Sequence, residues 1–213
     1  MEERLHLTDP VCQADSLMAG SGSSTETVTV LFCDLVGSTA LLSRLGDDAN
    51  DALRRDVFAA LREPLSRHRG AEVKSQGDGL MVAFRTSAAD AVGCAVEMHR
   101  SMRRLDRRQP LGLAIRVGVS LGEATFEDDD WFGTPVVEAA RLCAVARPQQ
   151  ILATDLVRAV VGSRGGFDFS PVGALVLKGF PEPVASCEVA WEPEPDLPEC
   201  PLPSGLDDPS DRF

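Results

Sequence analysis

The sequence has no apolar run near the roughly 18 residues that a membrane-spanning helix requires, and its first residues, MEERLHLTDP, lack the apolar core of a signal peptide. These absences predict a cytoplasmic protein. Its six cysteines include no CxxC pair and no zinc-like spacing. They therefore do not indicate a disulfide framework or a structural metal, and we expect the four in apolar stretches to pack as small hydrophobic residues.

Positive charge is also scarce, since the formal net charge is −12. A broad surface for nucleic acid or for an anionic membrane needs clustered Lys and Arg, so this balance argues against both kinds of partner. It does not exclude a single nucleotide, whose phosphates metal ions and a few local cations can neutralise. The 213 residues, 44% hydrophobic and 25% charged, are typical of a globular protein with a substantial core.

Composition divides the chain into three parts. Residues 1–26 end in AGSGSSTE and are predicted to be a flexible N-terminal segment. Residues 193–213 are rich in proline and acidic residues and form the predicted tail. One domain is expected between them, at residues 27–192.

Hydrophobic periodicity predicts an α+β domain. A near-continuous apolar run indicates a strand buried on both faces, and short strands meeting at Gly77-Asp78-Gly79 indicate a hairpin. Ser87 and Asp90 form a capping-box pattern before a helix. The predicted strands are 28–33, 71–76, 80–84, 111–122, 151–153, 167–177 and 184–190; the predicted helices are 48–63, one after Ser87, 133–146 and one from Asp155; residues 123–132 are predicted to be an acidic loop. The order β-α-β-β-α-β is that of a ferredoxin-like split βαβ unit, with a mixed or antiparallel sheet and flanking helices.

Two carboxylates stand where these strands end. Asp34 follows the apolar strand, and Asp78 lies in the Gly-Asp-Gly turn. Either residue alone would more simply be a helix cap or a turn residue. Brought together on adjacent strands, the pair would suit Mg²⁺ or Mn²⁺, which prefer carboxylate oxygens. The segment Val36-Gly37-Ser38-Thr39 opens toward a helix, and its free backbone N–H groups would suit phosphate oxygens.

Three segments carry a resemblance to a known family: TVTVLFCDLVGST at 27–39, VKSQGDGLMVAF at 73–84 and DDDWFGTPVVEAARL at 128–142. Together they resemble the catalytic domain of class III nucleotidyl cyclases, over roughly residues 27–190. The short 123–132 loop resembles bacterial members. The resemblance implies an adenylyl cyclase that converts ATP to cyclic AMP and pyrophosphate. It also implies two Mg²⁺ or Mn²⁺ ions held by Asp34, Asp78 and the backbone carbonyl of Leu35.

The resemblance also implies substrate contacts for residues that would otherwise read as surface charge. Lys74 and Asp130 align with a purine-binding pair, Arg141 with an arginine that holds the α-phosphate, and Lys178 with a lysine that binds the terminal phosphates. A lysine donor and a carboxylate acceptor match N1 and the 6-amino group of adenine, whereas guanine presents the reverse pattern. The prediction is therefore ATP. Arg116 is interpreted as structural.

One position departs from the family. The asparagine that usually orients the ribose, four residues before the arginine, is Val137 here. Valine cannot form that hydrogen bond, and Thr134 is a candidate to replace it. The expected loss is about 10²–10³-fold in turnover, by analogy with deleting one transition-state donor.

The family divides each active site between two protomers, with metal aspartates from one and purine, arginine and lysine contacts from the other. This chain has both sets, which predicts a homodimer with two shared sites. The alternatives are a degenerate cyclase domain that binds nucleotide as a dimerisation module, which Val137 favours, and a guanylyl cyclase, which Lys74 and Asp130 disfavour. A diguanylate cyclase is not supported, because its GG(D/E)EF signature is absent from the sequence.

Overall fold

The computed structural model describes residues 24–192. The elements, in chain order, are β1 Ser24–Leu35, α1 Ser38–Leu45, α2 Asp47–Arg67, β2 Ala71–Gln76, β3 Gly79–Phe84, α3 Ala88–Arg108, β4 Ile115–Glu127, β5 Asp130–Phe132, α4 Thr134–Val145, β6 Ile151–Thr154, α5 Asp155–Val161, a 3₁₀ turn Arg164–Gly166, β7 Phe169–Leu175 and β8 Val184–Val189. Because β1 begins at Ser24, the last residues of the predicted flexible segment belong to the sheet. The rest of that segment and the predicted tail lie outside the described residues.

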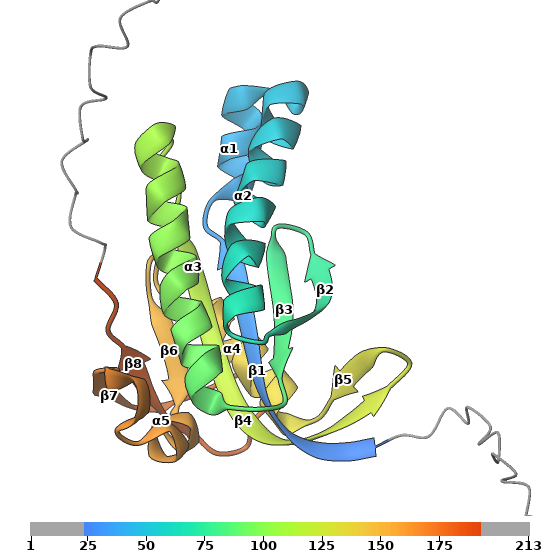
Figure 1. Ribbon diagram of the computed structural model, residues 1–213, viewed down its shortest axis with the longest axis vertical. Coiled ribbons are helices and arrows are strands. Elements are labelled where there is room, and N and C mark those ends of the chain that lie inside the picture. The colour runs from blue at the N-terminus through green and yellow to red at the C-terminus, as the bar shows by residue number, and fades with distance from the viewer. Residues whose placement is uncertain (1–23, 193–213) are drawn as a thin grey trace, which may run out of the picture.

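The sheet confirms the predicted architecture. Its order is β2-β3-β1-β4-β6-β8-β7, with β5 paired to β4 (Figure 1). Each neighbouring pair among these first four strands is antiparallel, so β1 and β2 run parallel with β3 between them, as in a ferredoxin-like split βαβ unit. Strand β6 then adds in parallel to β4, and β8 and β7 complete the sheet. The result is a mixed sheet with flanking helices.

Helices cover the two faces of the sheet unequally. In Figure 1, α2 and α3 lie in front of the sheet and α4 lies behind it. Strand β1 serves both sides, because successive side chains point to opposite faces. Leu31, Cys33 and Leu35 join the core with α2, α3 and α5, whereas Val28 and Val30 join a smaller core with α4 and β5. The prediction that this strand is buried on both faces is confirmed.

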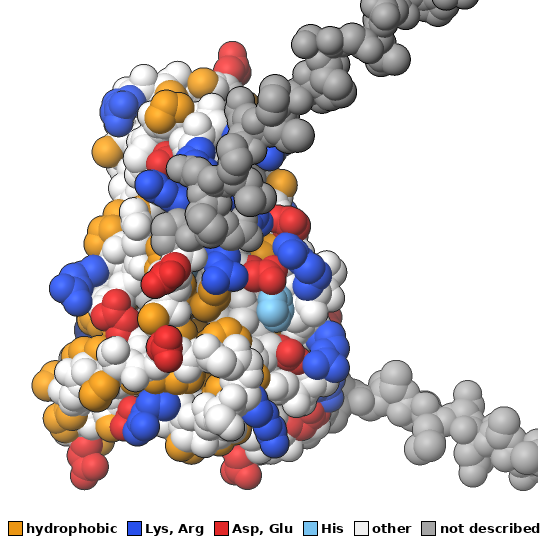
Figure 2. Space-filling model, turned by 60° about the vertical axis from the view of Figure 1, so that its left-hand side comes forward, with side chains coloured by type: hydrophobic (Ala, Val, Ile, Leu, Met, Phe, Trp, Pro, Cys, Tyr) orange, Lys and Arg blue, Asp and Glu red, His pale blue; other side chains and the backbone are white. Residues whose placement is uncertain are grey.

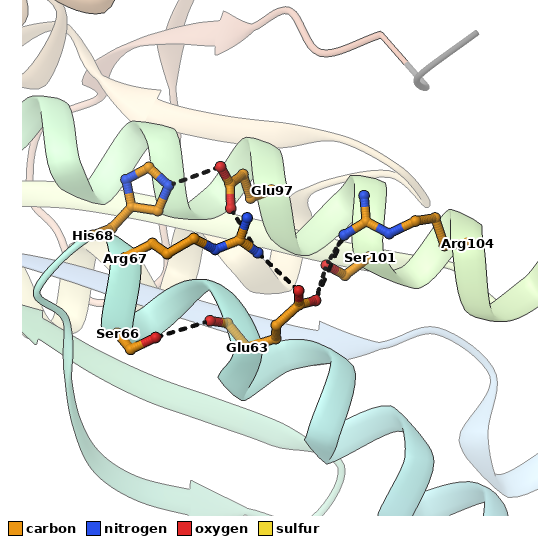
Figure 3. A network of polar contacts seen from close by, with 7 residues as sticks. All are labelled: Glu63, Ser66, Arg67, His68, Glu97, Ser101 and Arg104. Atoms are coloured by element: carbon orange, nitrogen blue, oxygen red, sulfur yellow. Dashed lines mark hydrogen bonds and ion pairs between the residues drawn. The ribbon is translucent and has the colours of Figure 1, made fainter. Parts of the chain in front are cut away.

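A polar network joins α2 to α3 above the larger core (Figure 3). Arg67 bonds Glu63 at 3.0 Å and Glu97 at 3.2 Å, and Ser101 donates to Glu63 at 3.2 Å. His68 lies 3.4 Å from Glu97. The contacts of Glu97 and Ser101 cross from α3 to the end of α2, and most of the charged groups are partly exposed, so they fix how the helices face each other more than they add to stability.

Glycine allows α4 to pack directly on β4. A Cβ at Gly118 would lie 2.2 Å from the carbonyl oxygen of Ala139 and 2.3 Å from the amide nitrogen of Cys143, both in the α4 backbone. Any side chain would push the helix away from the sheet. Gly118 therefore sets the distance between α4 and the strands that carry the site.

Two details of the sequence interpretation were wrong. Residues 123–132 are not a loop, because β4 continues to Glu127 and pairs with β5. Asp128 and Asp129 adopt φ values of 50° and 59°, which a two-residue hairpin turn requires and aspartate tolerates. The Ser87 cap is present and accepts from the Ala89 amide, but Asp90 does not complete a capping box, because it binds Arg69 and Thr86 instead.

Four cysteines and His99 are buried within the described residues. Cys33, Cys94, Cys143 and Cys187 are buried free thiols, as predicted, and burial raises the pKa of Cys33 to about 12. His99 is a packing residue, 2% exposed and stacked on Trp191 with 4.7 Å between ring centroids.

The surface carries charge of both signs. Figure 2 shows basic and acidic side chains interspersed over the face of the molecule drawn there. None of the helices within residues 24–192 is long and apolar enough to cross a membrane.

Candidate active site

Asp34 lies on β1, and Asp78 lies in the turn that leads into β3, the neighbouring strand. Asp34 stands near the end of β1, and its backbone partner on β3 is Gly79, the residue that follows Asp78. A Cβ at Gly79 would lie 2.5 Å from the carbonyl oxygen of Cys33, so only glycine lets the two strands approach this closely here. The hairpin glycine thereby brings the two aspartates to adjacent positions on neighbouring strands.

The two aspartates border different hollows. Asp78 lies beside Leu35 and Ser38, at the start of α1. Asp34 borders a hollow of about 190 Å³ between the sheet and α4, together with Gly79 and Arg116. Two of the predicted metal ligands, Asp78 and Leu35, thus border one hollow. The third, Asp34, borders the other, and its backbone pairs with Gly79, the residue after Asp78.

Arg116 is the main contact of Asp34 that sequence reasoning missed. It lies opposite Asp34 in the β1–β4 pairing. Its Nη2 and Nε atoms donate to Oδ2 of Asp34 at 2.6 and 3.0 Å, and its Nη1 atom donates to the carbonyl of Ala144 at 2.8 Å. The sequence offers little indication of this contact, because the two residues are 82 positions apart and only the pairing of β1 with β4 brings them together.

The predicted phosphate-binding segment begins α1. Gly37 has a φ of 72°, which turns the chain out of β1 and into the helix. The amide of Val36 donates to the carbonyl of Ala114 at 2.8 Å, so this donor belongs to the sheet and is not available to a phosphate. Ser38 and Thr39 are the first residues of α1, where amide groups have no partner within the helix.

Lys74 and Asp130 come together within one chain. Lys74 lies on β2 and Asp130 on β5, and the ammonium group of Lys74 binds Oδ2 of Asp130. Oδ1 of Asp130 accepts from the amide of Trp131 at 2.8 Å. Trp131 is 4% exposed and packs against Phe126, which fixes the hairpin on the sheet. Of the three consecutive aspartates, Asp128 and Asp129 form the turn, so Asp130 is the one that reaches Lys74.

Arg141 and Lys178 also lie side by side. The Nε atom of Arg141, on α4, donates to the backbone carbonyl of Lys178 at 3.2 Å. Lys178 lies in the exposed connection between β7 and β8, which is held down by Leu177 at 1% exposure. Lys74 and Lys178 are the only lysines in the sequence, and each occupies a predicted substrate position.

Val137 lies one helical turn before Arg141 on α4 and is 42% exposed. Its side chain is therefore not needed for the core, and an asparagine would fit there without loss of packing. Thr134 is the first residue of α4, two turns before Arg141. Both residues therefore lie on this helix, and the role of Thr134 at the ribose stays a prediction.

The donor set fits a divalent ion that also binds the substrate. Within residues 24–192 there is no group of three or more His, Cys, Asp or Glu side chains that could hold a metal by themselves. Mg²⁺ is commonly bound by one or two carboxylates together with substrate phosphates and water. Asp34, Asp78 and the carbonyl of Leu35 match that pattern.

A family model described as the adenylate and guanylate cyclase catalytic domain matches residues 21–188, and so covers the whole arrangement of strands and site residues given above. The chain belongs to the class III nucleotidyl cyclase family. This confirms the resemblance drawn from the three sequence segments.

The cyclase domain is similar to proteins that are named for both purine substrates. It is 34% identical over 187 residues to a putative adenylate cyclase 3 from Rhizobium meliloti, an alignment that covers 81% of this chain and 32% of the relative. The chain thus spans about a third of that relative. Its fold matches the adenylyl cyclase CyaB from P. aeruginosa with a TM-score of 0.74 and 24% identity, over 81% of this chain and 98% of that one.

The guanylyl cyclase Cya2 matches almost as well. Its TM-score is 0.71 at 23% identity, over 82% of this cyclase domain and 97% of that chain. Likeness of fold therefore does not discriminate between ATP and GTP, and the choice of purine depends on the side chains at the site.

Proposed function

We propose that this cyclase domain is an adenylyl cyclase, which forms cyclic AMP and pyrophosphate from ATP with two Mg²⁺ or Mn²⁺ ions at a homodimer interface. The observation that carries the choice of ATP is the contact of Lys74 with Asp130. The pair places one donor and one acceptor side by side on β2 and β5, which complements N1 and the 6-amino group of adenine. Guanine would put an N–H against the ammonium group and a carbonyl against the carboxylate, and unpaired polar groups of this kind are strongly rejected.

The reaction is an in-line attack of the ribose 3′-oxygen on the α-phosphorus. When bound, two metal ions would supply positive charge to the attacking and leaving oxygens and would favour loss of the hydroxyl proton. Asp34 and Asp78 would hold them with the carbonyl of Leu35. Arg141 would donate to the α-phosphate, and Lys178 to the terminal phosphates, where a positive charge stabilises departing pyrophosphate.

An exposed apolar stripe on α4 supports the homodimer. Val137 and Val145 are 42% and 51% exposed and lie eight positions apart, with Arg141 midway between them, so all three share one side of the helix. Phe132 and Val176, 52% and 82% exposed, extend the set of exposed apolar side chains to β5 and to the connection that carries Lys178. A second copy of the chain would cover these groups and bring the purine and phosphate residues of one protomer to the aspartates of the other.

Mixing two inactive variants tests this assembly. Asp34→Ala removes a metal ligand and Arg141→Ala removes a phosphate contact, so each homodimer has two damaged sites. A mixed dimer has one intact site, and full subunit exchange should restore about a quarter of the wild-type rate. Exchange confirmed by a tag, with no recovery of activity, would contradict shared sites.

The first experiment is to measure cyclic nucleotide formation by the purified chain, with ATP or GTP and with Mn²⁺, Mg²⁺ or EDTA. Metal-dependent cyclic AMP with little cyclic GMP is the expected result. Cyclic GMP as the main product would make the chain a guanylyl cyclase. Binding of nucleotide and metal without turnover would support the second candidate, a cyclase domain that has become a binding module, which Val137 at the ribose position favours.

A further inference from the structure

We propose that Arg116 positions the carboxylate of Asp34 for metal binding, by holding one carboxylate oxygen and leaving the other free on the side of Asp78. The inference rests on the proposed function, because it assigns a role toward the metal ions of that site. It adds a residue that neither composition nor motif spacing indicates.

The hold on Asp34 uses only one of its oxygens. Both Nε and Nη2 of Arg116 donate to Oδ2, at 3.0 and 2.6 Å. Oδ1 accepts no hydrogen bond from the described residues, and it would lie 3.5 Å from a Cβ built on Gly79. The unpaired oxygen is therefore turned toward β3 at Gly79, the residue that follows Asp78, while the paired oxygen is turned toward β4.

Arg116 is itself held on both sides. Its backbone belongs to β4, whose neighbouring residues Ile115 and Val117 are at most 1% exposed. Its remaining terminal nitrogen, Nη1, donates at 2.8 Å to Ala144 in the last turn of α4. That carbonyl has no partner within the helix, and a cation at a helix C-terminus is favourable. A guanidinium anchored in this way limits the rotation of the Asp34 side chain.

Only arginine combines these contacts. Its planar fork directs two N–H groups to one oxygen while a third points elsewhere, whereas lysine is a compact charge without fixed directions. Residues that orient metal ligands typically contribute 10- to 100-fold to metal affinity or activity. A contrary role is also physically possible, because a guanidinium beside a cation site repels the cation and competes for Oδ2. The two roles predict opposite changes in metal affinity when Arg116 is removed.

The test is Mn²⁺ binding to the full chain, followed as the loss of the free-ion electron paramagnetic resonance signal. Arg116→Gln should weaken Mn²⁺ binding about 10-fold or more, and Arg116→Lys should show a smaller loss. The matched control is Arg62→Gln, since Arg62 donates two hydrogen bonds of 2.7 Å to the carboxylate of Glu72 on the opposite side of the sheet. It should leave Mn²⁺ affinity unchanged.

Thermal unfolding of each variant separates positioning from folding. If Arg116→Gln fails to fold, Arg116→Lys carries the test, and unchanged Mn²⁺ affinity in that variant would overturn the proposal. Unchanged or tighter Mn²⁺ binding in folded Arg116→Gln would overturn it as well, and tighter binding would indicate that Arg116 competes with the metal ion for Asp34.

Asp34→Asn distinguishes failure of the positioning role from failure of the metal site itself. Loss of Mn²⁺ binding in Asp34→Asn but not in Arg116→Gln refutes only the positioning role, whereas Mn²⁺ binding that does not depend on Asp34 refutes the metal site and the proposed function.

Discussion

The face of the sheet under α2, α3 and α5 and the face under α4 differ in how much of their surface is used for packing. The first holds the larger hydrophobic core, closed by two long helices and their polar network (Figures 1 and 3). The second carries one helix packed directly on Gly118, and it also holds Asp34, Arg116, Arg141 and the Lys74–Asp130 pair. One face accounts for most of the stability, and the other leaves polar groups available for chemistry.

Because packing and site residues lie mainly on different faces, substitutions on the two faces should affect folding and catalysis separately. Changes under α4, and at Asp78 beside the start of α1, should affect turnover or substrate choice with little effect on the free energy of unfolding. Changes under α2 and α3 should lower that free energy and leave substrate choice intact. The following predictions run from the largest expected effect to the smallest.

Asp34→Asn or Asp78→Asn should lower cyclase turnover by about 10³-fold or more, because several kcal/mol of charge stabilisation depend on each metal ligand. Turnover is measured with saturating ATP and Mn²⁺, and the melting temperature is measured in parallel. Both carboxylates are partly exposed, so the melting temperature should change little. Near-normal turnover in either folded variant would remove that residue from the metal site.

Lys74→Glu combined with Asp130→Gly should lower kcat/KM for ATP by about 100-fold and raise the relative use of GTP, because the donor and acceptor pattern then no longer matches adenine. The measurement is kcat/KM for each nucleotide. Glu72→Gln, on the same strand β2, is the control and should keep the ATP preference. Unchanged ATP kinetics in the double variant would contradict the purine assignment.

Leu61→Ala should lower the free energy of unfolding by about 3 kcal/mol, because Leu61 is fully buried between α2 and the sheet and leaves a cavity. Denaturant titration gives the change, and the ratio of ATP to GTP use should stay that of the wild type. Leu156→Ala removes a leucine that is 51% exposed on α5, and it should cost about 0.5 kcal/mol or less. A changed nucleotide ratio in Leu61→Ala would show that the two faces are not independent.

His99, on α3, should make the stability of the protein sensitive to acid. Burial lowers the pKa of His99 from 6.5 to about 3, so the folded protein keeps it neutral while the unfolded chain protonates near pH 6.5. Its contribution to stability is complete above pH 6.5 and is lost progressively as the pH falls toward 3. Between pH 7 and pH 5 the loss should be about 2 kcal/mol.

Comparison with His99→Phe isolates this contribution, because phenylalanine keeps the stacking on Trp191 without a titratable ring. Denaturant midpoints measured from pH 7 to pH 5 should fall less steeply in the variant than in the wild type. Parallel pH profiles for the two proteins would show that His99 is not responsible for the acid sensitivity.

Local patterns sufficed for the elements that position the aspartates. The apolar run before Asp34 and the Gly-Asp-Gly turn predicted two adjacent strands, and the β1–β3 pairing confirms them. Both features depend on short segments whose periodicity is visible in the chain. The hairpin of residues 123–132 was missed because its acidic composition suggests a loop, and its two positive φ values arise from the pairing of β4 with β5.

The residue types and their order determined the family, and they are the basis of the predicted metal ligands and of the predicted preference for adenine, since these follow from motifs carried by short segments. The tertiary structure shows the contact of Lys74 with Asp130, the aspartate that the sequence had indicated, and only the tertiary structure revealed that Arg116 meets Asp34. Those contacts join residues 56 and 82 positions apart. Their geometry depends on strand register, which is set by how the two cores pack against the sheet and cannot be deduced from any one segment.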